Sequence, residues 1–265
     1  MHTAALVELG LAPEWTYEAI EVAPAGFEEL VRSLPAQGFA GVNVTVPHKL
    51  AALALADQAS NAALQIGAAN VLTFRDGRIE AENTDTDGIL EALPGPVDRQ
   101  RALVMGAGGS ARAAVWALVH AGADVHVWNR TAAKAERLAA DLGGTALGTA
   151  DSGRQTADFD LIVNCTSVGM AAASAPGGQP PVQDGTADLK PLPLDADGLH
   201  ANQVVVELVY GTVETQLIAT ARARGATPVD GLDVLVHQGV AVLRLWTGLE
   251  PPLETMRRAA RGVPT

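Results

Sequence analysis

The feature of this sequence that most constrains its fold is a glycine-rich turn between a short apolar run and a helical pattern. The run is Ala102–Met105, the turn is Gly106-Ala107-Gly108-Gly109-Ser110-Ala111, and the helical spacing covers Ser110–Ala121. In a G-x-G-x-x-G/A turn the first glycine permits a tight bend, the second lets the backbone approach a pyrophosphate, and the small last residue lets helix and strand pack closely. We therefore expect a dinucleotide at the N-terminus of this helix, with a purely structural glycine turn as the alternative.

The residues after the next predicted strand indicate which dinucleotide is bound. Asp124–Trp128 is followed by Asn129-Arg130-Thr131, with Lys134 one turn later. Enzymes that use NAD usually place a carboxylate here to hold the ribose hydroxyls, and this sequence has none. Arg130 and Lys134 would bind a 2′-phosphate instead, so the pattern favours NADP. The alternative is a solvated arginine followed by a helix cap.

Strand-like and helical patterns alternate along the chain, which predicts an α/β protein built from parallel βαβ units. The predicted strands are Thr16–Val22, Val42–Val46, Val71–Phe74, Arg78–Ala81, Ala102–Met105, Asp124–Trp128, Leu161–Asn164 and Val204–Val209. The predicted helices are Phe27–Leu34, His48–Leu55, Asp85–Leu93, Ser110–Ala121, Ala132–Leu142, Thr215–Arg224, Leu232–Leu245 and Leu253–Ala260. A loop is expected over residues 171–198, which are rich in Ala, Gly, Pro and Asp.

The Pro94-Gly95-Pro96 segment breaks the pattern and predicts a linker between two domains. We expect residues 1–93 to form a substrate-binding domain with a mixed or parallel sheet. Residues 101–235 would form the dinucleotide-binding domain. The C-terminal helices, residues 236–265, would return to complete the first domain.

Composition excludes several classes of function. The formal net charge is −12, from 18 basic and 30 acidic residues, and a field of that sign repels nucleic acids and anionic membrane surfaces. The single cysteine, Cys165, has no internal disulfide partner, which fits a reducing cytoplasm. It is expected to be a small core residue rather than a nucleophile. The six histidines show no metal-ligand spacing, so no metal is expected. We expect a monomer or a homodimer.

Three polar turns lie in the first third of the chain. They contain Lys49 after a strand, Asn70 in a small-residue turn, and Asp85 in Asn83-Thr84-Asp85. Taken singly, each has an ordinary structural explanation: a surface lysine, a turn former and a helix N-cap. Because ligands bind at the carboxyl ends of strands in α/β sheets, the position of Lys49 also suits a binding site.

Taken together, the motifs resemble the shikimate dehydrogenase family. In chain order they are NVTVPHK, IGAAN, NTDTDG, GAGGSAR, NRTAAKA, NCTSVGM, VVVELVYGT, GLDVLVHQG and WTG. The resemblance extends from Met1 to Gly248. It implies two α/β domains, the second Rossmann-like, in a cytoplasmic enzyme of aromatic amino-acid and chorismate biosynthesis. The implied reaction is the reversible NADPH-dependent reduction of 3-dehydroshikimate to shikimate.

The resemblance also implies roles for individual residues. Lys49 matches the catalytic lysine, and Asp85 matches its paired aspartate. The implied substrate-binding residues are Thr45, Asn70, Tyr210 and Gln238. The implied cofactor-binding residues are Gly106, Ala107, Gly108, Gly109, Ser110, Asn129, Arg130, Thr131 and Lys134, with Leu208 and Gly231 near the nicotinamide. From the residues alone, Tyr210 is equally a core residue.

The chemistry of these residue types agrees with such a role. Hydride transfer to a ketone leaves a negatively charged oxygen, which an ammonium group stabilises and protonates. Lysine suits this task because its pKa is readily shifted, whereas arginine stays charged. Asp85 would hold a substrate hydroxyl and orient Lys49.

The sequence departs from the family pattern at its start and in one loop. The family has a strand and a Ser-x-Ser loop, which holds the substrate carboxylate, before the Met-His segment that begins this sequence. We expect the true start to lie upstream. The alternatives are a quinate/shikimate-type dehydrogenase and a non-catalytic NADP-binding relative. Glu207 and Thr212 stand where the family often has Asp and Pro.

Overall fold

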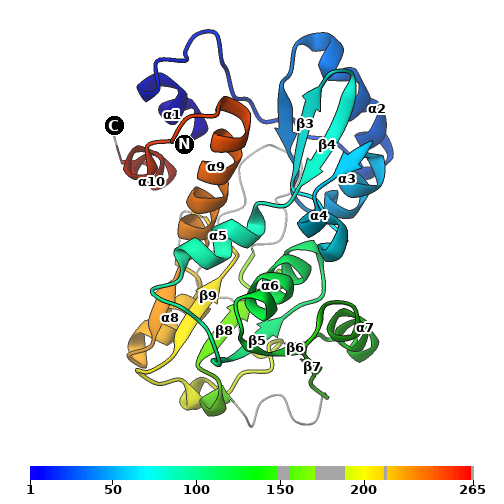
Figure 1. The fold of residues 1–265 in the computed structure, drawn as a ribbon. Helices are drawn as coiled ribbons and strands as arrows, with labels where there is room; N and C mark the ends of the chain where they lie inside the picture. The colour runs from blue at the N-terminus through cyan, green and yellow to red at the C-terminus, as the bar shows by residue number, and fades with distance from the viewer. Residues whose placement is uncertain (149–155, 171–188, 212–213, 264–265) are drawn as a thin grey trace. The chain divides into compact units, whose positions relative to one another are not determined.

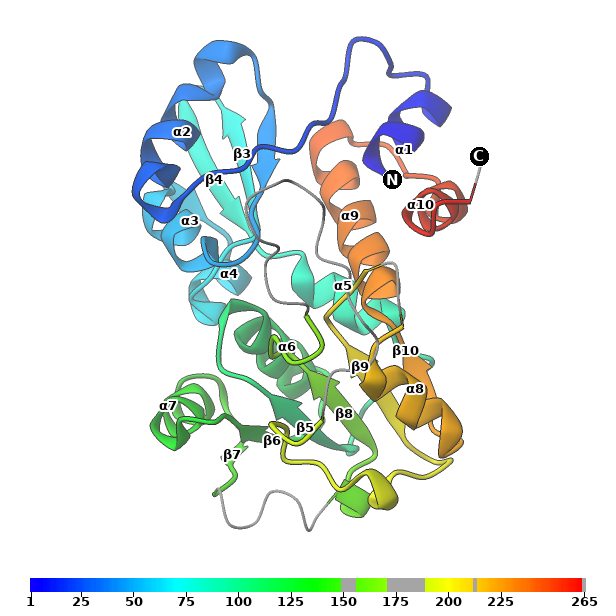
Figure 2. The ribbon, with the colours of Figure 1, turned by 180° about the vertical axis from the view of Figure 1, so that it is seen from behind.

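The computed structural model describes residues 1–148, 156–170, 189–211 and 214–263, and the chain divides into two compact units. The first unit combines Met1–Gly88 with Leu235–Thr265, and the second is Ile89–Val234. The first boundary falls within α5 (Asp85–Ala92), because Ile89 is fully buried in a core of the second unit. Figures 1 and 2 show the elements of each unit from two sides.

The first unit contains a mixed four-stranded sheet in the order β1-β3-β4-β2. Its strands are β1 (Gly41–Asn43), β2 (Gln58–Ala59), β3 (Val71–Arg75) and β4 (Arg78–Glu82). β3 is antiparallel to both β1 and β4, whereas β2 is parallel to β4. The tight β3–β4 connection has positive φ at Asp76 and Gly77, as two-residue hairpin turns require.

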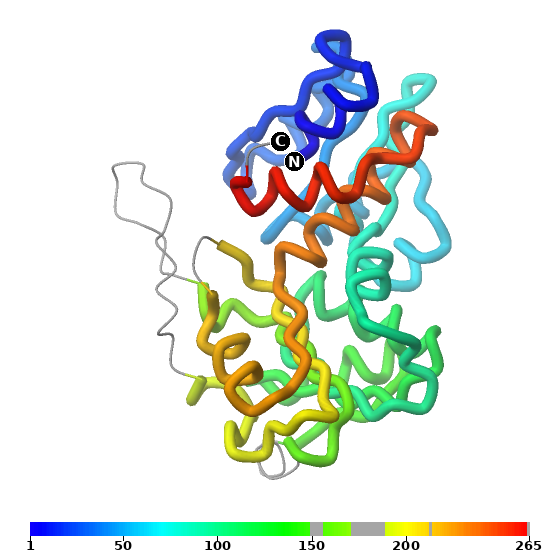
Figure 3. The backbone as a smooth tube through the Cα atoms, turned by 90° about the vertical axis from the view of Figure 1, so that its left-hand side faces the viewer, coloured from blue at the N-terminus to red at the C-terminus, as the bar shows by residue number. Residues whose placement is uncertain are grey.

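Helices cover this sheet and build a second core beside it. They are α2 (Phe27–Ser33), α3 (Lys49–Leu55) and α4 (Asn61–Ile66), with short 3₁₀ turns at Pro24–Gly26 and Pro35–Gln37. The second core joins α1 (His2–Glu8), α9 (Gly231–Thr247) and α10 (Leu253–Ala260) through buried apolar residues such as Leu6, Leu243 and Met256. The first and last helices therefore lie side by side, as Figure 3 shows.

The second unit contains a parallel six-stranded sheet in the order β10-β9-β8-β5-β6-β7. Its strands are β5 (Arg101–Met105), β6 (Asp124–Trp128), β7 (Thr145–Ala146), β8 (Leu161–Asn164), β9 (Val204–Glu207) and β10 (Thr227–Val229). Its helices, besides the residues of α5 and α9 that belong to it, are α6 (Gly109–His120), α7 (Ala132–Leu142) and α8 (Gln216–Ala223), with 3₁₀ turns at Thr156–Asp158 and Ala196–Gly198.

Both faces of this parallel sheet are buried. Ala102 and Val104 of β5 pack into the core that includes α6 and α7, whereas Leu103 and Met105 pack into the core that includes α8. Successive side chains of a strand point to opposite faces, so a strand covered on both sides must be apolar throughout, as β5 is. None of the described helices is long and apolar enough to cross a membrane.

The predicted α/β organisation is observed, but one predicted strand is wrong. Thr16–Val22 belongs to neither sheet, although its residues alternate like a strand. An alternating pattern forms a strand only where a neighbour completes the hydrogen-bond ladder, and among the described strands β1 pairs only with β3. The segment is held through other contacts instead: Tyr17 Oη donates to Asn43 Oδ1 at 2.9 Å, and the His48 ring lies 3.1 Å from the Val22 carbonyl oxygen.

Several predicted bounds also change. The strand expected over Val42–Val46 is the shorter β1, and Val204–Val209 ends at Glu207. Within the expected loop 171–198, residues 189–198 include a 3₁₀ turn and the buried Leu192. The rest of that loop and Thr212 lie outside the described residues.

We predict that Gly41→Ala destabilises the first unit by about 1–3 kcal/mol, because the new methyl group overpacks a closed site. It would lie 2.6 Å from the Leu72 carbonyl oxygen and 2.7 Å from the Trp246 indole, which donates to Thr73 Oγ1 at 3.0 Å. Urea unfolding measures the loss. Gly26→Ala is the matched control, because its new atom meets only Val22 at 3.6 Å. Equal stability of the two variants would contradict this account of the α9 contact.

Candidate active site

A buried ion pair between Lys49 and Asp85 is the centre of the polar site in the first unit. Lys49 Nζ lies 2.5 Å from Asp85 Oδ2, and the two side chains are only 10% and 14% exposed. Lys49 is the first residue of α3, and Asp85 is the first residue of α5. A buried charge is retained only when it is paired and its remaining hydrogen-bonding capacity is satisfied. The structure therefore brings together the two residues that the sequence analysis expected to act as a pair.

Asn70 connects this pair to the rest of the network. Its Nδ2 group donates to Asp85 Oδ1 at 2.9 Å and lies 3.4 Å from Gln238 Oε1. Its Oδ1 atom accepts from the Thr84 backbone N–H at 2.8 Å. Asn70 is 2% exposed, so every one of these contacts is made away from bulk water. The amide thus fixes one oxygen of Asp85 while Lys49 takes the other.

Backbone hydrogen bonds set the positions of these side chains. The Asn70 carbonyl oxygen accepts from the Val44 N–H at 2.7 Å, and the Ala69 N–H donates to the Lys49 carbonyl oxygen at 2.9 Å. Asn83 acts as a brace on the other side, because its side chain binds the Ala68 carbonyl oxygen and the Asp85 N–H. Three turns that are separate in the sequence are thereby locked to one another.

The expected substrate residues are not all brought into this network. Asn70 and Gln238 belong to it, and Gln238 is also anchored by donation from Nε2 to the Leu235 carbonyl oxygen. Thr45 is exposed at the turn before α3. Tyr210 belongs to the second unit and is 47% exposed, which excludes the core alternative for it.

Two buried polar atoms among the described residues of the first unit have no hydrogen-bond partner: His2 Nε2 and Asn43 Nδ2. Tyr17 links them, because it stacks on His2 with ring centroids 4.0 Å apart and donates to Asn43. Burial lowers the pKa of His2 to about 4, so its ring is neutral at pH 7. The sequence analysis named neither residue as a site residue, although Asn43 begins the NVTVPHK motif, because their burial and their contacts with Tyr17 depend on the fold.

The glycine turn in the second unit has the geometry that the sequence analysis expected. Gly106 has φ +120°, and a Cβ there would lie 3.0 Å from the Cys165 carbonyl oxygen, so only glycine fits. A Cβ on Gly108 would meet no atom within 4 Å, which leaves its backbone open to a ligand. Ala111 is fully buried and lets α6 pack closely. The turn thus presents the N-terminus of a 12-residue helix at an accessible surface.

The segment after β6 carries two exposed basic side chains, Arg130 and Lys134. Arg130, Thr131 and Lys134 are exposed, and the Asn129 side chain donates to the Thr131 carbonyl oxygen at 3.0 Å. Thr131 is the N-cap residue of α7, but its side chain makes no cap hydrogen bond. The alternative in which Thr131 serves as a side-chain cap is therefore not supported.

Glu207, at the end of β9, is a buried carboxyl group that the sequence analysis noted only as a departure from the family pattern. It is 1% exposed, and both its oxygens lie 3.0 Å from Asn164 Nδ2. It also accepts from the Val209 N–H at 2.9 Å. Burial raises the pKa of this carboxyl to about 7 against the lowering effect of these hydrogen bonds.

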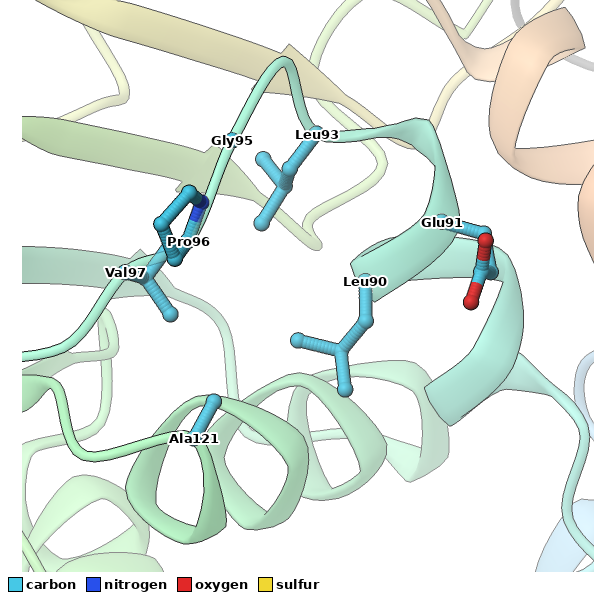
Figure 4. Close-up of a pocket in the computed structure, with 7 residues that line it drawn as sticks. All are labelled: Leu90, Glu91, Leu93, Gly95, Pro96, Val97 and Ala121. Carbon is cyan, nitrogen blue, oxygen red and sulfur yellow. The ribbon is translucent and has the colours of Figure 1, made fainter.

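Two hollows of the second unit lie away from these residues. One of about 290 Å³ is lined by α5, by residues 93–97, which lie inside the second unit and not between the units, and by Ala121 at the end of α6, as Figure 4 shows. A second of about 270 Å³ touches Leu161 and Val204, the first residues of β8 and β9. Ligands of parallel sheets bind at the opposite, carboxyl ends of the strands, so these hollows are not taken as the site. No group of three potential metal-ligating side chains occurs among the described residues.

The parallel sheet with its glycine turn, together with the lysine–aspartate pair of the other unit, defines a two-unit α/β protein of the dinucleotide-binding class. Three family models match the chain: the shikimate dehydrogenase substrate binding domain over residues 1–72, shikimate/quinate 5-dehydrogenase over 90–172, and the shikimate 5′-dehydrogenase C-terminal domain over 231–261. The chain belongs to the shikimate dehydrogenase family.

Whole-chain relatives agree with this assignment. The NADP(+) shikimate dehydrogenase of Halobacterium salinarum is 39% identical over 98% of this chain and 92% of its own length. Shikimate 5-dehydrogenase from Thermus thermophilus, solved with NADP(H) and shikimate, is 37% identical with a TM-score of 0.83, covering 98% of this chain and 92% of that one. Quinate dehydrogenase from Corynebacterium glutamicum, solved with NAD, is 30% identical with a TM-score of 0.81. The match covers 99% of this chain and 93% of that one.

We predict that Glu207 makes the protein less stable as the pH rises through about 7. The folded-state pKa lies above the ordinary value of 4.5, so the folded protein favours the protonated carboxyl. That stabilisation is complete below about pH 4.5 and is lost as the pH passes 7. Its full size is up to about 3 kcal/mol, from 1.36 kcal/mol per pKa unit. Urea unfolding of the wild type and Glu207→Gln across this range measures it.

The Gln variant stays neutral, so its stability should rise relative to that of the wild type as the pH increases. Glu91→Gln removes an exposed carboxylate of the same unit and serves as the control, with no pH-dependent difference expected. Parallel pH curves for the wild type and Glu207→Gln would show that Glu207 does not titrate in this range.

Proposed function

We propose that this chain is an NADP-dependent shikimate dehydrogenase that catalyses reversible hydride transfer between NADPH and 3-dehydroshikimate. The observation that carries the proposal is the buried Lys49–Asp85 pair, held by Asn70, in a chain of the shikimate dehydrogenase family. Relatives of this family include an enzyme solved with both NADP(H) and shikimate. The reaction belongs to aromatic amino-acid and chorismate biosynthesis, and we propose a cytoplasmic location.

The pair provides the acid–base chemistry of the reaction. The bound nicotinamide supplies or accepts the hydride. Lys49 holds a positive charge where the carbonyl oxygen becomes negative, and its Nζ donates the proton that completes the hydroxyl group. Asp85 keeps the ammonium group oriented, and it accepts a hydrogen bond from a substrate hydroxyl. Because both groups are largely withdrawn from water, the electrostatic stabilisation is stronger than at an exposed site.

Polar side chains around the pair would recognise a polyhydroxy acid. Asn70 and Gln238 present amide groups beside Asp85, and Thr45 adds a hydroxyl at the exposed turn before α3. Tyr210 is proposed as a fourth substrate contact. Amides and hydroxyls both donate and accept hydrogen bonds, so they suit a substrate that carries several hydroxyl groups.

The second unit has the residues to hold NADP. The backbone of Gly106-Ala107-Gly108-Gly109-Ser110 opens α6 and would bind the pyrophosphate, since Gly108 leaves its surface clear. Arg130 and Lys134 would bind the 2′-phosphate, with Asn129 and Thr131 beside them. Leu208 and Gly231 are proposed to lie near the nicotinamide. The local positive charge matters because the net charge of −12 repels an anionic cofactor.

This division of roles assigns a substrate domain to residues 1–93 with 236–265, and a cofactor domain to residues 101–235. The ligands are small molecules, and we propose a monomer or homodimer that does not bind nucleic acid.

A quinate/shikimate-type dehydrogenase is the second candidate, because quinate dehydrogenase from Corynebacterium glutamicum covers nearly the whole chain. Absorbance of reduced nicotinamide, measured with NADP⁺ and either shikimate or quinate, separates the two by their kcat/KM values. NADPH binding without turnover of either acid would instead identify a non-catalytic NADP-binding relative.

We predict that Lys49→Ala lowers kcat by about 10²–10⁴-fold, since a positioned proton donor contributes about this much. The dissociation constant for shikimate, measured by calorimetry, should rise far less. Lys49→Arg retains the charge but cannot readily give up a proton, so it should also lose kcat. Lys190→Ala removes an exposed lysine and controls for the change in net charge. Collapse of binding with kcat unchanged would make Lys49 a binding residue only.

We predict that Arg130→Ala weakens NADPH binding by about 10–100-fold, the equivalent of one hydrogen bond to a charged group at about 1.5–3 kcal/mol. NADH lacks the 2′-phosphate, so its dissociation constant should barely change. Fluorescence titration with each cofactor measures both constants. Arg137→Ala, on the exposed face of α7, is the matched control. An equal loss for NADPH and NADH would place the 2′-phosphate elsewhere.

A further inference from the structure

The Glu207 carboxyl group lies where two neighbouring parallel strands end. Glu207 is the last residue of β9 and pairs in register with Asn164, the last residue of β8. The side chains meet through the two 3.0 Å contacts of Asn164 Nδ2. Nothing in the proposed reaction uses this carboxyl, and burying it is costly. A buried carboxyl that the reaction does not use therefore calls for a structural or functional explanation.

Glu207 and Asn164 hold the two segments that follow their strands. After β8, Asn164 Oδ1 accepts from the Thr166 backbone N–H at 3.0 Å and from its hydroxyl at 2.7 Å. Thr166 Oγ1 in turn accepts from the Val168 N–H at 3.1 Å. After β9, the Glu207 carboxyl accepts from the Val209 N–H. One carboxylate–amide contact therefore fixes the course of both segments.

Two further elements pack against the same carboxyl. Thr215 Oγ1 lies 3.4 Å from Glu207 Oε2 and is also the N-cap acceptor of α8. Gly231 begins α9 so close to this backbone that a Cβ would lie 2.6 Å from the Val209 carbonyl oxygen. The segment 207–211 is thus held by the Glu207 carboxyl and by the start of α9, so a substitution of Glu207 would alter its position.

The order of the strands indicates which half of a bound dinucleotide would lie over the segments that follow β8 and β9. The glycine turn follows β5, and the Arg130 segment follows β6 on one side of it. If the 2′-phosphate half of a dinucleotide lies over β6, the other half must extend the opposite way, over β8 and β9. On that side the Cys165 backbone is so close to Gly106 that a Cβ on Gly106 would lie 3.0 Å from the Cys165 carbonyl oxygen. Met170 and Tyr210, farther along the two segments, are 54% and 47% exposed.

We propose that Glu207 is a positioning residue for NADP(H): through Asn164 it fixes the segments after β8 and β9 that support the nicotinamide half of the cofactor. This inference rests on the proposed function of the second unit as the cofactor domain. It concerns how the cofactor is held and adds no step to the hydride transfer.

The charge state of Glu207 sets the strength of this contact. The ionised carboxylate accepts from Asn164 through both oxygens and from the Val209 N–H through Oε1. A proton on Oε2 leaves the two Oε1 contacts in place, but they weaken because hydrogen bonds to a neutral acceptor are weaker than those to a carboxylate. Because burial places the pKa of Glu207 near 7, the two forms exchange near neutral pH. Within the described residues, the carboxyl is hydrogen-bonded by Asn164, Thr215 and the Leu208 and Val209 N–H groups, all of which are uncharged. The titratable groups on the elements packed against it are Cys165, Tyr210, Glu214, Arg222, Asp230, Asp233 and His237. The Asp230 side chain accepts from the Leu232 and Asp233 N–H groups.

The test is the dissociation constant of NADPH, measured by fluorescence titration between about pH 6 and about pH 8.5. At the upper pH, Glu207→Gln should bind NADPH about tenfold more weakly than the wild type, the loss of about one hydrogen bond to a charged group. Toward the lower pH the two proteins should converge, because the wild type then carries the neutral acid. Glu207→Asp retains the charge and should keep the wild-type pH dependence.

Two controls separate positioning from a general loss of structure. Glu91→Gln, exposed on α5, should follow the wild type at every pH. Shikimate binding should change far less than NADPH binding in all variants, because the proposed substrate residues Asn70 and Gln238 belong to the other unit and only Tyr210 lies in the segment that Glu207 holds. Equal NADPH affinities, or parallel pH curves, for the wild type and Glu207→Gln would overturn this inference alone. A wild type that binds no NADPH would overturn the proposed function together with it.

Discussion

The buried contact between the Lys49 ammonium and the Asp85 carboxylate is the interaction on which the first unit depends. Removing two charges from water is expensive, and attraction offsets the cost only when the remaining hydrogen-bonding capacity is also met. Asn70 donates a hydrogen bond to the second oxygen of Asp85, and the Asn83 side chain accepts from the Asp85 backbone N–H. The polar turns are therefore a structural requirement of the pair, in addition to the substrate site that we propose for them. The same placement shields the lysine ammonium group from bulk water.

Much of this arrangement could be predicted from the sequence because local chemistry dictates it. The strand, glycine turn and helix around Gly106 require a positive φ and close packing that few residues permit, and the structure has both. The α/β class followed from the alternation of patterns, and the family from the order of motifs; the comparisons confirm both. The Lys49–Asp85 contact was expected from that resemblance, and the structure shows it.

What failed or was missed depends on tertiary context. Thr16–Val22 alternates like a strand, yet a ladder needs a neighbouring strand, and no alternation within the segment reveals whether one is present. The short β2, β7 and β10 carry too few residues for a period to be detected. Glu207 was noted only because the family often has Asp at this position. Its contact with Asn164 was not predicted, because the two residues are 43 positions apart and meet only through the pairing of their strands. The partnerless atoms of His2 and Asn43 likewise have no local signature.

The contact of Asn70 with Gln238 spans 168 residues of the chain. The helix that carries Gln238 is itself held by α1 and α10, so the first and last helices share one apolar core. During synthesis on the ribosome, the early polar turns emerge long before the segment that completes them. A prematurely terminated product therefore lacks both Gln238 and the packing that seats it. Completion of this polar network thus requires the segment around Gln238 to be in place.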